Sequence, residues 1–71
     1  MDQFIDGREM SPPEPFERTM AALDLIGDDG QVVLRVNCQP HPLFNALRRN
    51  GYRWDEASLP DGSFEYRIRR R

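Results

Sequence analysis

A proline-rich stretch, Ser11-Pro12-Pro13-Glu14-Pro15-Phe16-Glu17-Arg18, constrains the fold more than any other segment of the chain. Proline lacks an N–H group, but N–H groups in the first turn of a helix have no acceptor within the helix, so prolines cost little there. With Pro13 at the first helical position and Pro15 at the third, Glu14 and Glu17 lie at the positive end of the helix dipole. The stretch therefore predicts that an extended segment ends and a helix begins here.

Length and composition favour one small globular domain. A chain of 71 residues buries only about 60% of the surface of its unfolded state, so its core must be a single layer. Its 38% hydrophobic and 31% charged residues are typical of a folded protein rather than a disordered one. No apolar run approaches the length of a membrane span, and the acidic N-terminus lacks the basic region of a signal peptide. We expect a single domain over residues 1–71, located in the cytoplasm, where the lone Cys38 stays reduced.

Hydrophobic periodicity predicts six elements in the order β-α-β-α-β-β. Apolar residues at helical spacing predict helices over 13–26 and 42–50, and alternating or β-branched runs predict strands over 3–9, 31–38, 52–58 and 63–70. Turns rich in glycine and aspartate separate several of these segments. Amphipathic helices and strands must bury their apolar sides against another layer. This order of elements therefore predicts an α+β two-layer sandwich, a four-stranded mixed sheet with two helices on one face.

The period of two along each strand predicts which side chains face the core. Cys38 shares its parity with Val32, Leu34 and Val36, so we expect a buried thiol that reacts slowly. The opposite, open face of the sheet would be rich in arginine: Arg35, Arg53, Arg67 and Arg69. These arginines either pair with carboxylates across the strands, which we favour, or bind RNA or another polyanion.

The run Ile5-Asp6-Gly7-Arg8-Glu9-Met10-Ser11-Pro12-Pro13-Glu14-Pro15 resembles the N-terminal signature of the TusA/SirA-like sulfur carriers. In those carriers a short strand leads to Cys-Pro-x-Pro at the start of the first helix. Together with Pro40-His41-Pro42-Leu43, Gly51-Tyr52-Arg53-Trp54 and the strand from Gly62 to Tyr66, the run resembles a bacterial domain-of-unknown-function family allied to the carriers. The resemblance implies the same two-layer sandwich and a small cytoplasmic protein.

The sequence departs from the carriers at the cysteine that holds their sulfur. Matching Pro13-Glu14-Pro15 to Pro-x-Pro puts Pro12 in the place of that cysteine, and neither Pro12 nor Ser11 can hold a persulfide. The resemblance then implies a non-enzymatic module that keeps the carriers' docking surface and binds a protein partner, for instance one of sulfur-transfer or redox metabolism. The residues expected to contact that partner are Arg8, Ser11, Pro12, Pro13, Glu14, Pro15 and Arg18.

Cys38 and His41, three residues apart, are the remaining candidates for reactivity. One thiolate and one imidazole are two ligands, whereas a structural zinc site needs four, so we expect no metal site. Cys38 could instead act as a thiol or sulfur carrier, which we keep as an alternative function. The sequence contains no glycine-rich phosphate loop and no catalytic triad pattern, so we expect no cofactor and no enzymatic activity.

Overall fold

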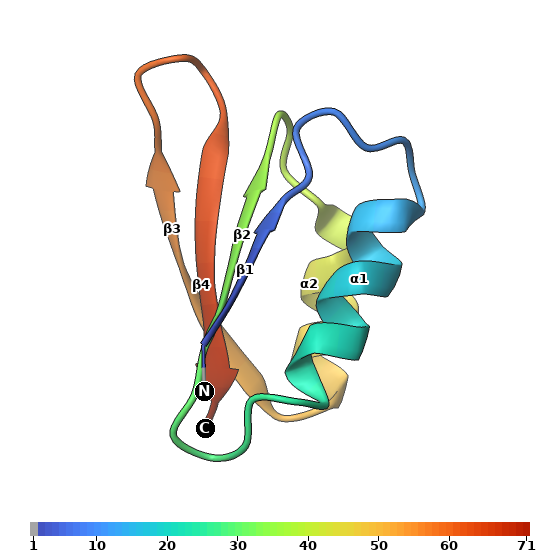
Figure 1. Cartoon of the computed structure of the whole chain (residues 1–71), viewed down its shortest axis with the longest axis vertical. Coiled ribbons are helices and arrows are strands. Elements are labelled where there is room, and N and C mark those ends of the chain that lie inside the picture. The colour runs from blue at the N-terminus through green and yellow to red at the C-terminus, as the bar shows by residue number, and fades with distance from the viewer. Residues whose placement is uncertain (1) are drawn as a thin grey trace.

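The computed structural model describes residues 2–71, which form four strands and two helices. In chain order these are β1 (Gln3–Asp6), α1 (Glu14–Leu23), β2 (Val32–Val36), α2 (His41–Arg49), β3 (Tyr52–Ser58) and β4 (Phe64–Arg70). The strands lie side by side in the order β1-β2-β4-β3, with β1 parallel to β2 and the other pairs antiparallel. Both helices cover the same face of this sheet (Figure 1). The predicted β-α-β-α-β-β sandwich is therefore confirmed.

The interior is one layer of side chains between the sheet and the two helices. Leu23 from α1 and Leu43 and Leu47 from α2 are at most 1% exposed. Burial of a leucine side chain contributes about 1.5–3 kcal/mol, so this layer supplies much of the free energy of folding. The sheet contributes the side chains that alternate toward the helices: Ile5, Val32, Leu34, Val36, Tyr52, Tyr66 and Ile68.

The first strand is shorter than the predicted 3–9, because the chain turns after Gly7, whose carbonyl oxygen accepts the N–H of Met10 at 3.2 Å. Gly7 is buried and donates its N–H to the carbonyl oxygen of Arg35 at 2.7 Å. A Cβ atom on Gly7 would lie 3.2 Å from that oxygen and 3.3 Å from Cβ of Pro15. Glycine thus permits the close approach that brings the start of α1 against the end of β2.

The first helix also differs slightly from the predicted 13–26. Pro13 is the residue before the helix rather than its first residue, so Pro15 lies at the second helical position. The amide of Glu17 donates to the carbonyl oxygen of Pro13 at 3.0 Å and closes the first turn. The helix ends at Leu23, and Ile26 packs into the core from the turn that follows.

The second strand corrects the prediction for Cys38. It ends at Val36 instead of residue 38, and Cys38 is exposed, so the expectation of a buried thiol on the core face is wrong. The parity argument fails because Asn37 and Cys38 no longer follow the pleat: the side-chain amide of Asn37 donates to the carbonyl oxygen of Arg8 in the loop after β1. Side-chain alternation assigns faces only while the strand continues.

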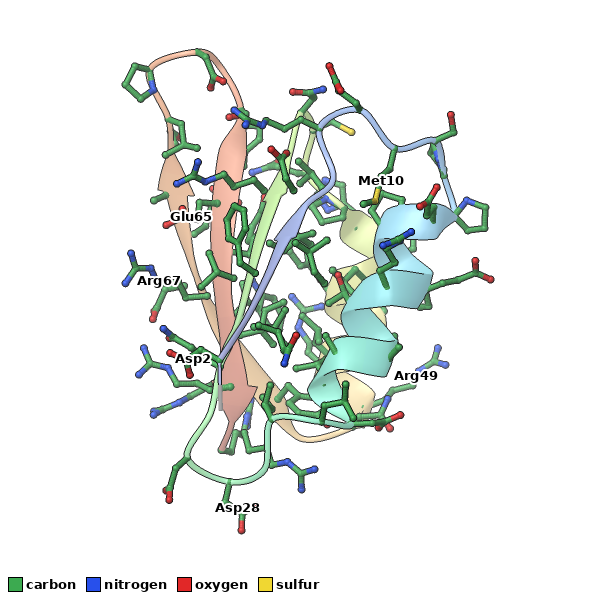
Figure 2. The ribbon with its side chains drawn as sticks, in the orientation of Figure 1. Asp2, Met10, Asp28, Arg49, Glu65 and Arg67 are labelled. Carbon is green, nitrogen blue, oxygen red and sulfur yellow. The ribbon has the colours of Figure 1, made fainter. Side chains whose placement is uncertain are left out.

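The face of the sheet away from the helices carries the predicted charged side chains. Figure 2 shows Glu65 and Arg67 on the side of β4 opposite the helices. Strand pairing places Arg35 opposite Glu65, Arg67 opposite Asp55 and Arg69 opposite Arg53. No helix in the described part of the chain has both the length and the apolar character needed to cross a membrane.

Candidate functional site

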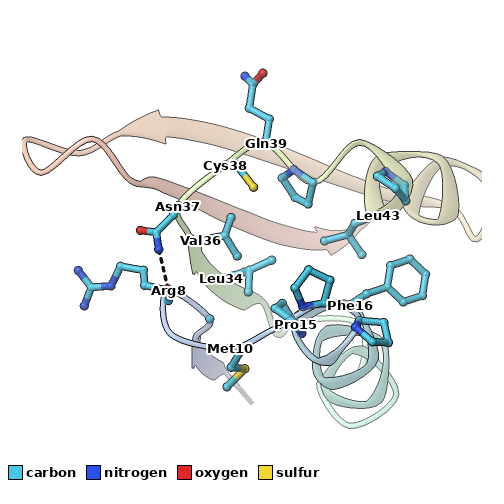
Figure 3. Close-up of a pocket in the computed structure, with 15 residues that line it drawn as sticks. Arg8, Met10, Pro15, Phe16, Leu34, Val36, Asn37, Cys38, Gln39 and Leu43 are labelled. Atoms are coloured by element: carbon cyan, nitrogen blue, oxygen red, sulfur yellow. Dashed lines mark hydrogen bonds between the residues drawn. The ribbon is translucent and has the colours of Figure 1, made fainter.

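An apolar groove of about 400 Å³ opens where the start of α1 meets the segment between β2 and α2 (Figure 3). Leu34 and Val36 contribute from β2, and Leu43 contributes from α2. The segment before and within the first turn of α1 supplies Met10, Pro12, Pro13, Pro15 and Phe16. The rest of the lining comes from the loop after β1, from the segment between β2 and α2 and from the first turn of α2: Gly7, Arg8, Asn37, Cys38, Gln39, Pro40 and Pro42.

Both helices begin with the same Pro-x-Pro arrangement at this groove. Pro13 and Pro40 occupy the position before each helix, and Pro15 and Pro42 occupy the second helical position. Neither helix has a side chain that caps its start with a hydrogen bond. Because proline has no N–H, these two helix starts present proline rings in place of some of the usual free donors. The groove is therefore suited to apolar groups more than to anions held by backbone amides.

Of the residues predicted to contact a partner, four line the groove: Arg8, Pro12, Pro13 and Pro15. Ser11 lies in the same loop, and its carbonyl oxygen accepts the N–H of Glu14 at 2.9 Å. Glu14 accepts a hydrogen bond from Nε of Arg18 at 2.9 Å, one helical turn along an exposed face of α1. The predicted set thus gathers at one edge of the domain.

Arg8 makes its polar contacts within the domain. Its Nε and Nη2 donate to Asp6 at 2.9 and 2.7 Å, and its Nη1 donates to Asp61 at 3.1 Å. These hydrogen bonds lower the pKa of Asp6 to about 2, and the two carboxylates raise the pKa of Arg8. The pKa of Asp61 is also lowered, mainly by the hydrogen bonds that it accepts from Ser63 and to a smaller extent by Arg8. Arg8 joins the end of β1 to the turn between β3 and β4.

Cys38 is brought to the groove by the segment between β2 and α2. Its neighbours are held on both sides, because Asn37 donates to the carbonyl oxygen of Arg8 and the Gln39 amide donates to Glu56 at 3.1 and 3.3 Å. Glu56 also accepts the hydroxyl of Tyr66 at 2.7 Å. The pKa of Tyr66 is raised, mainly by burial and also by this hydrogen bond. Its phenol therefore stays protonated and donates to Glu56. Cys38 therefore sits in a tethered loop.

The structure does not join Cys38 and His41 into one reactive pair. His41 is the first residue of α2, and its ring contacts Phe44 edge-on, with ring centroids 5.6 Å apart. Cys38 lines the groove, whereas His41 is absent from that lining. Within residues 2–71, no three His, Cys, Asp or Glu side chains lie close enough together to hold a metal ion.

The arginines of the open sheet face are mostly paired with carboxylates. Arg35 and Arg67 donate to the two oxygens of Glu65 at 2.9 and 3.3 Å, and Arg69 donates to Asp55 at 3.1 Å. The two hydrogen bonds to Glu65 lower its pKa, and the bond from Arg35 has the larger effect. Arg53 has no ion pair within the described residues. Arg35 and Arg69 thus pair across strands as predicted, whereas Arg67 pairs with Glu65 of its own strand.

Sequence reasoning missed that the two Pro-x-Pro segments lie at one groove. The predicted contact residues are Arg8, residues 11–15 and Arg18, whereas Pro40-His41-Pro42-Leu43 enters the prediction only as part of the family resemblance. Met10, Phe16 and Leu43 are not among the predicted contact residues, although all three line the groove. The repeated Pro-x-Pro pattern at both helix starts was the signal in the sequence that could have connected them.

Comparisons with known proteins agree with this architecture. No curated protein sequence matches the chain significantly. Among solved structures, the crystal structure of a SirA-like protein from Desulfitobacterium hafniense is similar, with a TM-score of 0.82 and 25% sequence identity over 96% of this chain and 95% of that one. The model of the family described as "Uncharacterized conserved protein (DUF2249)" matches residues 4–70. The chain therefore belongs to the DUF2249 family and has a SirA-like fold, as its resemblance to a family allied to the sulfur carriers predicted.

Proposed function

We propose that this domain is a non-enzymatic, sulfur-carrier-like binding module that docks on a protein partner through the edge formed by residues 8–18. The observation that carries the proposal is the apolar groove at that edge, lined by the starts of both helices. An apolar, concave surface of this kind is where binding partners bury side chains most favourably. The domain would recognise its partner by burying an apolar side chain of the partner between the two helix starts.

Rigidity of the groove supports the docking role. Proline rings fix the backbone torsion φ, so Pro13, Pro15, Pro40 and Pro42 hold the groove walls in place before binding. Arg8 and Asn37 fasten the β1–α1 loop to neighbouring segments through their hydrogen bonds. A preformed groove loses little conformational entropy when a partner binds, which favours affinity.

A carboxylate placed inside the groove tests this proposal. Pro42 is exposed at the second position of α2, where an acidic residue suits the helix dipole, so Pro42→Asp should keep the fold. Pro60→Asp makes the same change in the β3–β4 turn, away from the groove, and serves as the matched control. In affinity capture from a lysate of the cells that make the protein, we expect a specific partner with the wild type and with Pro60→Asp only. Equal capture by all three proteins would place docking elsewhere.

The exposure of Cys38 favours a second candidate function, that of a thiol carrier. Its side chain lines the same groove as Pro12, the residue that the resemblance matches to the carriers' cysteine. In such a role the Cys38 thiolate attacks the outer sulfur of a donor persulfide, the donor's S–S bond breaks, the donor leaves as a thiolate, and Cys38 becomes the persulfide. Both the thiol and the docked partner would then share one groove.

Sulfur loading distinguishes the two candidates. The domain is incubated with a cysteine desulfurase and cysteine, and its intact mass is measured without reductant. A carrier gains one sulfur atom in the wild type and none in Cys38→Ser, and His41→Ala loads more slowly if the imidazole assists. A pure docking module gains none in any variant, while Cys38→Ser still captures the partner.

A further inference from the structure

A second, polar hollow adjoins the apolar groove and shares part of its wall. It is lined by Asp6, Arg8, Glu9 and Asn37, and Arg8 and Asn37 also line the groove. Its volume of about 580 Å³ is open to solvent and large enough for a long polar side chain. A ligand that occupies the groove can therefore extend directly into this hollow.

The hollow carries a net negative charge. The guanidinium of Arg8 is bonded to the carboxylates of both Asp6 and Asp61, so its charge is more than neutralised within the domain. Glu9 is exposed and makes no hydrogen bond or ion pair within residues 2–71. The carboxylates of Asp6 and Glu9 thus line the hollow beside one guanidinium, and a third carboxylate, Asp61, also pairs with that guanidinium.

This charge distribution, together with the prolines, restricts the chemistry of the partner. A nucleic acid or an acidic peptide would be repelled by the carboxylates. Prolines at 12, 13, 15, 40 and 42 remove backbone donors that a partner strand would need for strand addition. An apolar side chain beside a cationic one satisfies both the groove and the hollow.

We propose, resting on the docking role above, that the partner segment carries an apolar anchor for the groove and an adjacent Lys or Arg that pairs with Glu9 in the hollow. The anchor is held by burial against Met10, Phe16 and Leu43. The cation is held in a solvent-exposed ion pair, which contributes modestly and is screened by salt. Burial therefore supplies most of the affinity, and charge selects among apolar partners.

Selection from a library of short random peptides displayed on phage tests the inference with the 71-residue chain as the target. Glu9→Gln removes the charge of an exposed side chain that makes no hydrogen bond or ion pair within residues 2–71, so the fold should be unaffected. Asp29→Asn makes an equivalent change in the α1–β2 turn, at the opposite end of the molecule from Met10 in Figure 2, where the neighbouring Asp28 is labelled. Pro42→Asp, with Pro60→Asp as its control, blocks the apolar groove.

We expect the wild type, Asp29→Asn and Pro60→Asp to enrich peptides that combine an apolar anchor with an adjacent Lys or Arg. Glu9→Gln should still enrich the apolar anchor but lose the basic preference, and it should bind a selected peptide about two- to fivefold more weakly at low salt. Chemical shifts of the Met10 methyl group report occupancy of the groove by the added peptide.

Two contrary outcomes are possible, and they contradict different parts of the proposal. If the selected peptides are apolar without a basic preference and bind the wild type and Glu9→Gln equally, the partner carries no cation for the hollow, but the docking role remains. Enrichment that is the same on Pro42→Asp as on the wild type, or no enrichment on either, would overturn docking in the groove and this inference with it.

Discussion

At the scale of single residues, the environment of Cys38 depends on two side-chain hydrogen bonds from its neighbours. Asn37 binds the loop after β1 and Gln39 binds Glu56 of β3, so the chain leaves the pleat of β2 and turns toward α2. The thiol is exposed at the groove as a result. A thiol in this position is accessible to reagents without any unfolding of the domain.

We therefore predict that native Cys38 reacts completely with a disulfide reagent at a rate within about tenfold of the rate in the unfolded chain, because access limits the reaction of buried thiols. Release of the reagent's chromophore measures both rates, with and without urea. Cys38→Ser gives the baseline. Labelling that requires urea would show that the thiol is covered in solution.

At the scale of the elements, the open sheet face is organised around Glu65 of β4. This side chain has an exposed fraction of 10%, although it lies on the face away from the helices, because Arg35 of β2 and Arg67 of β4 cover it. Its two oxygens accept one hydrogen bond from each guanidinium. One carboxylate thus joins β2 and β4 through side chains in addition to their backbone ladder.

Glu65→Gln should lower the free energy of unfolding by about 1–2 kcal/mol at neutral pH, since a charge-assisted partner is lost for two partly exposed guanidiniums. The pKa of Glu65 is lowered from its ordinary value of 4.5 in the folded state. Its stabilisation is therefore present above pH 4.5 and is lost as the pH falls through the lower, folded-state pKa. Urea denaturation at pH 7 and pH 3 should show the difference between wild type and variant shrinking in acid. Asp29→Asn, at an exposed carboxylate in the turn after α1, is the control, and an equal effect there would rule out this explanation.

The same pairing bears on RNA binding by Arg35, Arg53, Arg67 and Arg69. With three of these arginines in ion pairs, we predict no detectable binding of single-stranded RNA at physiological salt. Fluorescence anisotropy of a labelled oligonucleotide across a salt series measures this. The opposite result is an affinity that falls steeply with salt, with a shallower slope in the double variant Arg53→Gln/Arg69→Gln, as counterion release requires.

At the scale of the whole molecule, a single apolar layer holds every element in place. Leu47 of α2 is fully buried in it, whereas Leu25, in the turn after α1, is 66% exposed. A domain of this length has a free energy of unfolding of about 4–11 kcal/mol, so one large cavity removes a substantial part of it. Because the same Leu→Ala change is made at both positions, a difference in the loss of unfolding free energy reports the burial of the side chain.

We predict that Leu47→Ala lowers the free energy of unfolding by about 2–5 kcal/mol and Leu25→Ala by less than about 0.5 kcal/mol. Urea denaturation followed by circular dichroism measures both values. Similar losses at the two positions would mean that Leu25 is covered in solution, for example by a partner or a second copy.

The sequence alone determined the element order, the faces of the strands and the helix starts, because each depends on local chemistry. Alternation along β4 correctly placed Tyr66 and Ile68 in the core and Glu65 and Arg67 on the open face. Proline at 13 and 15 located the start of α1 to within one residue. These features follow from side-chain period and from the missing proline N–H, and neither needs knowledge of distant segments.

Only the tertiary structure decided where β2 ends and what surrounds the proline-rich segment. The hydrogen bond from Asn37 to the carbonyl oxygen of Arg8 joins residues 29 positions apart, and it takes Cys38 out of the pleat. The groove likewise combines the loop and helix start around residues 7–16 with residues 34–43. Pairing between distant segments depends on the complete fold, so the alternation that placed Val32, Leu34 and Val36 in the core could not place Cys38.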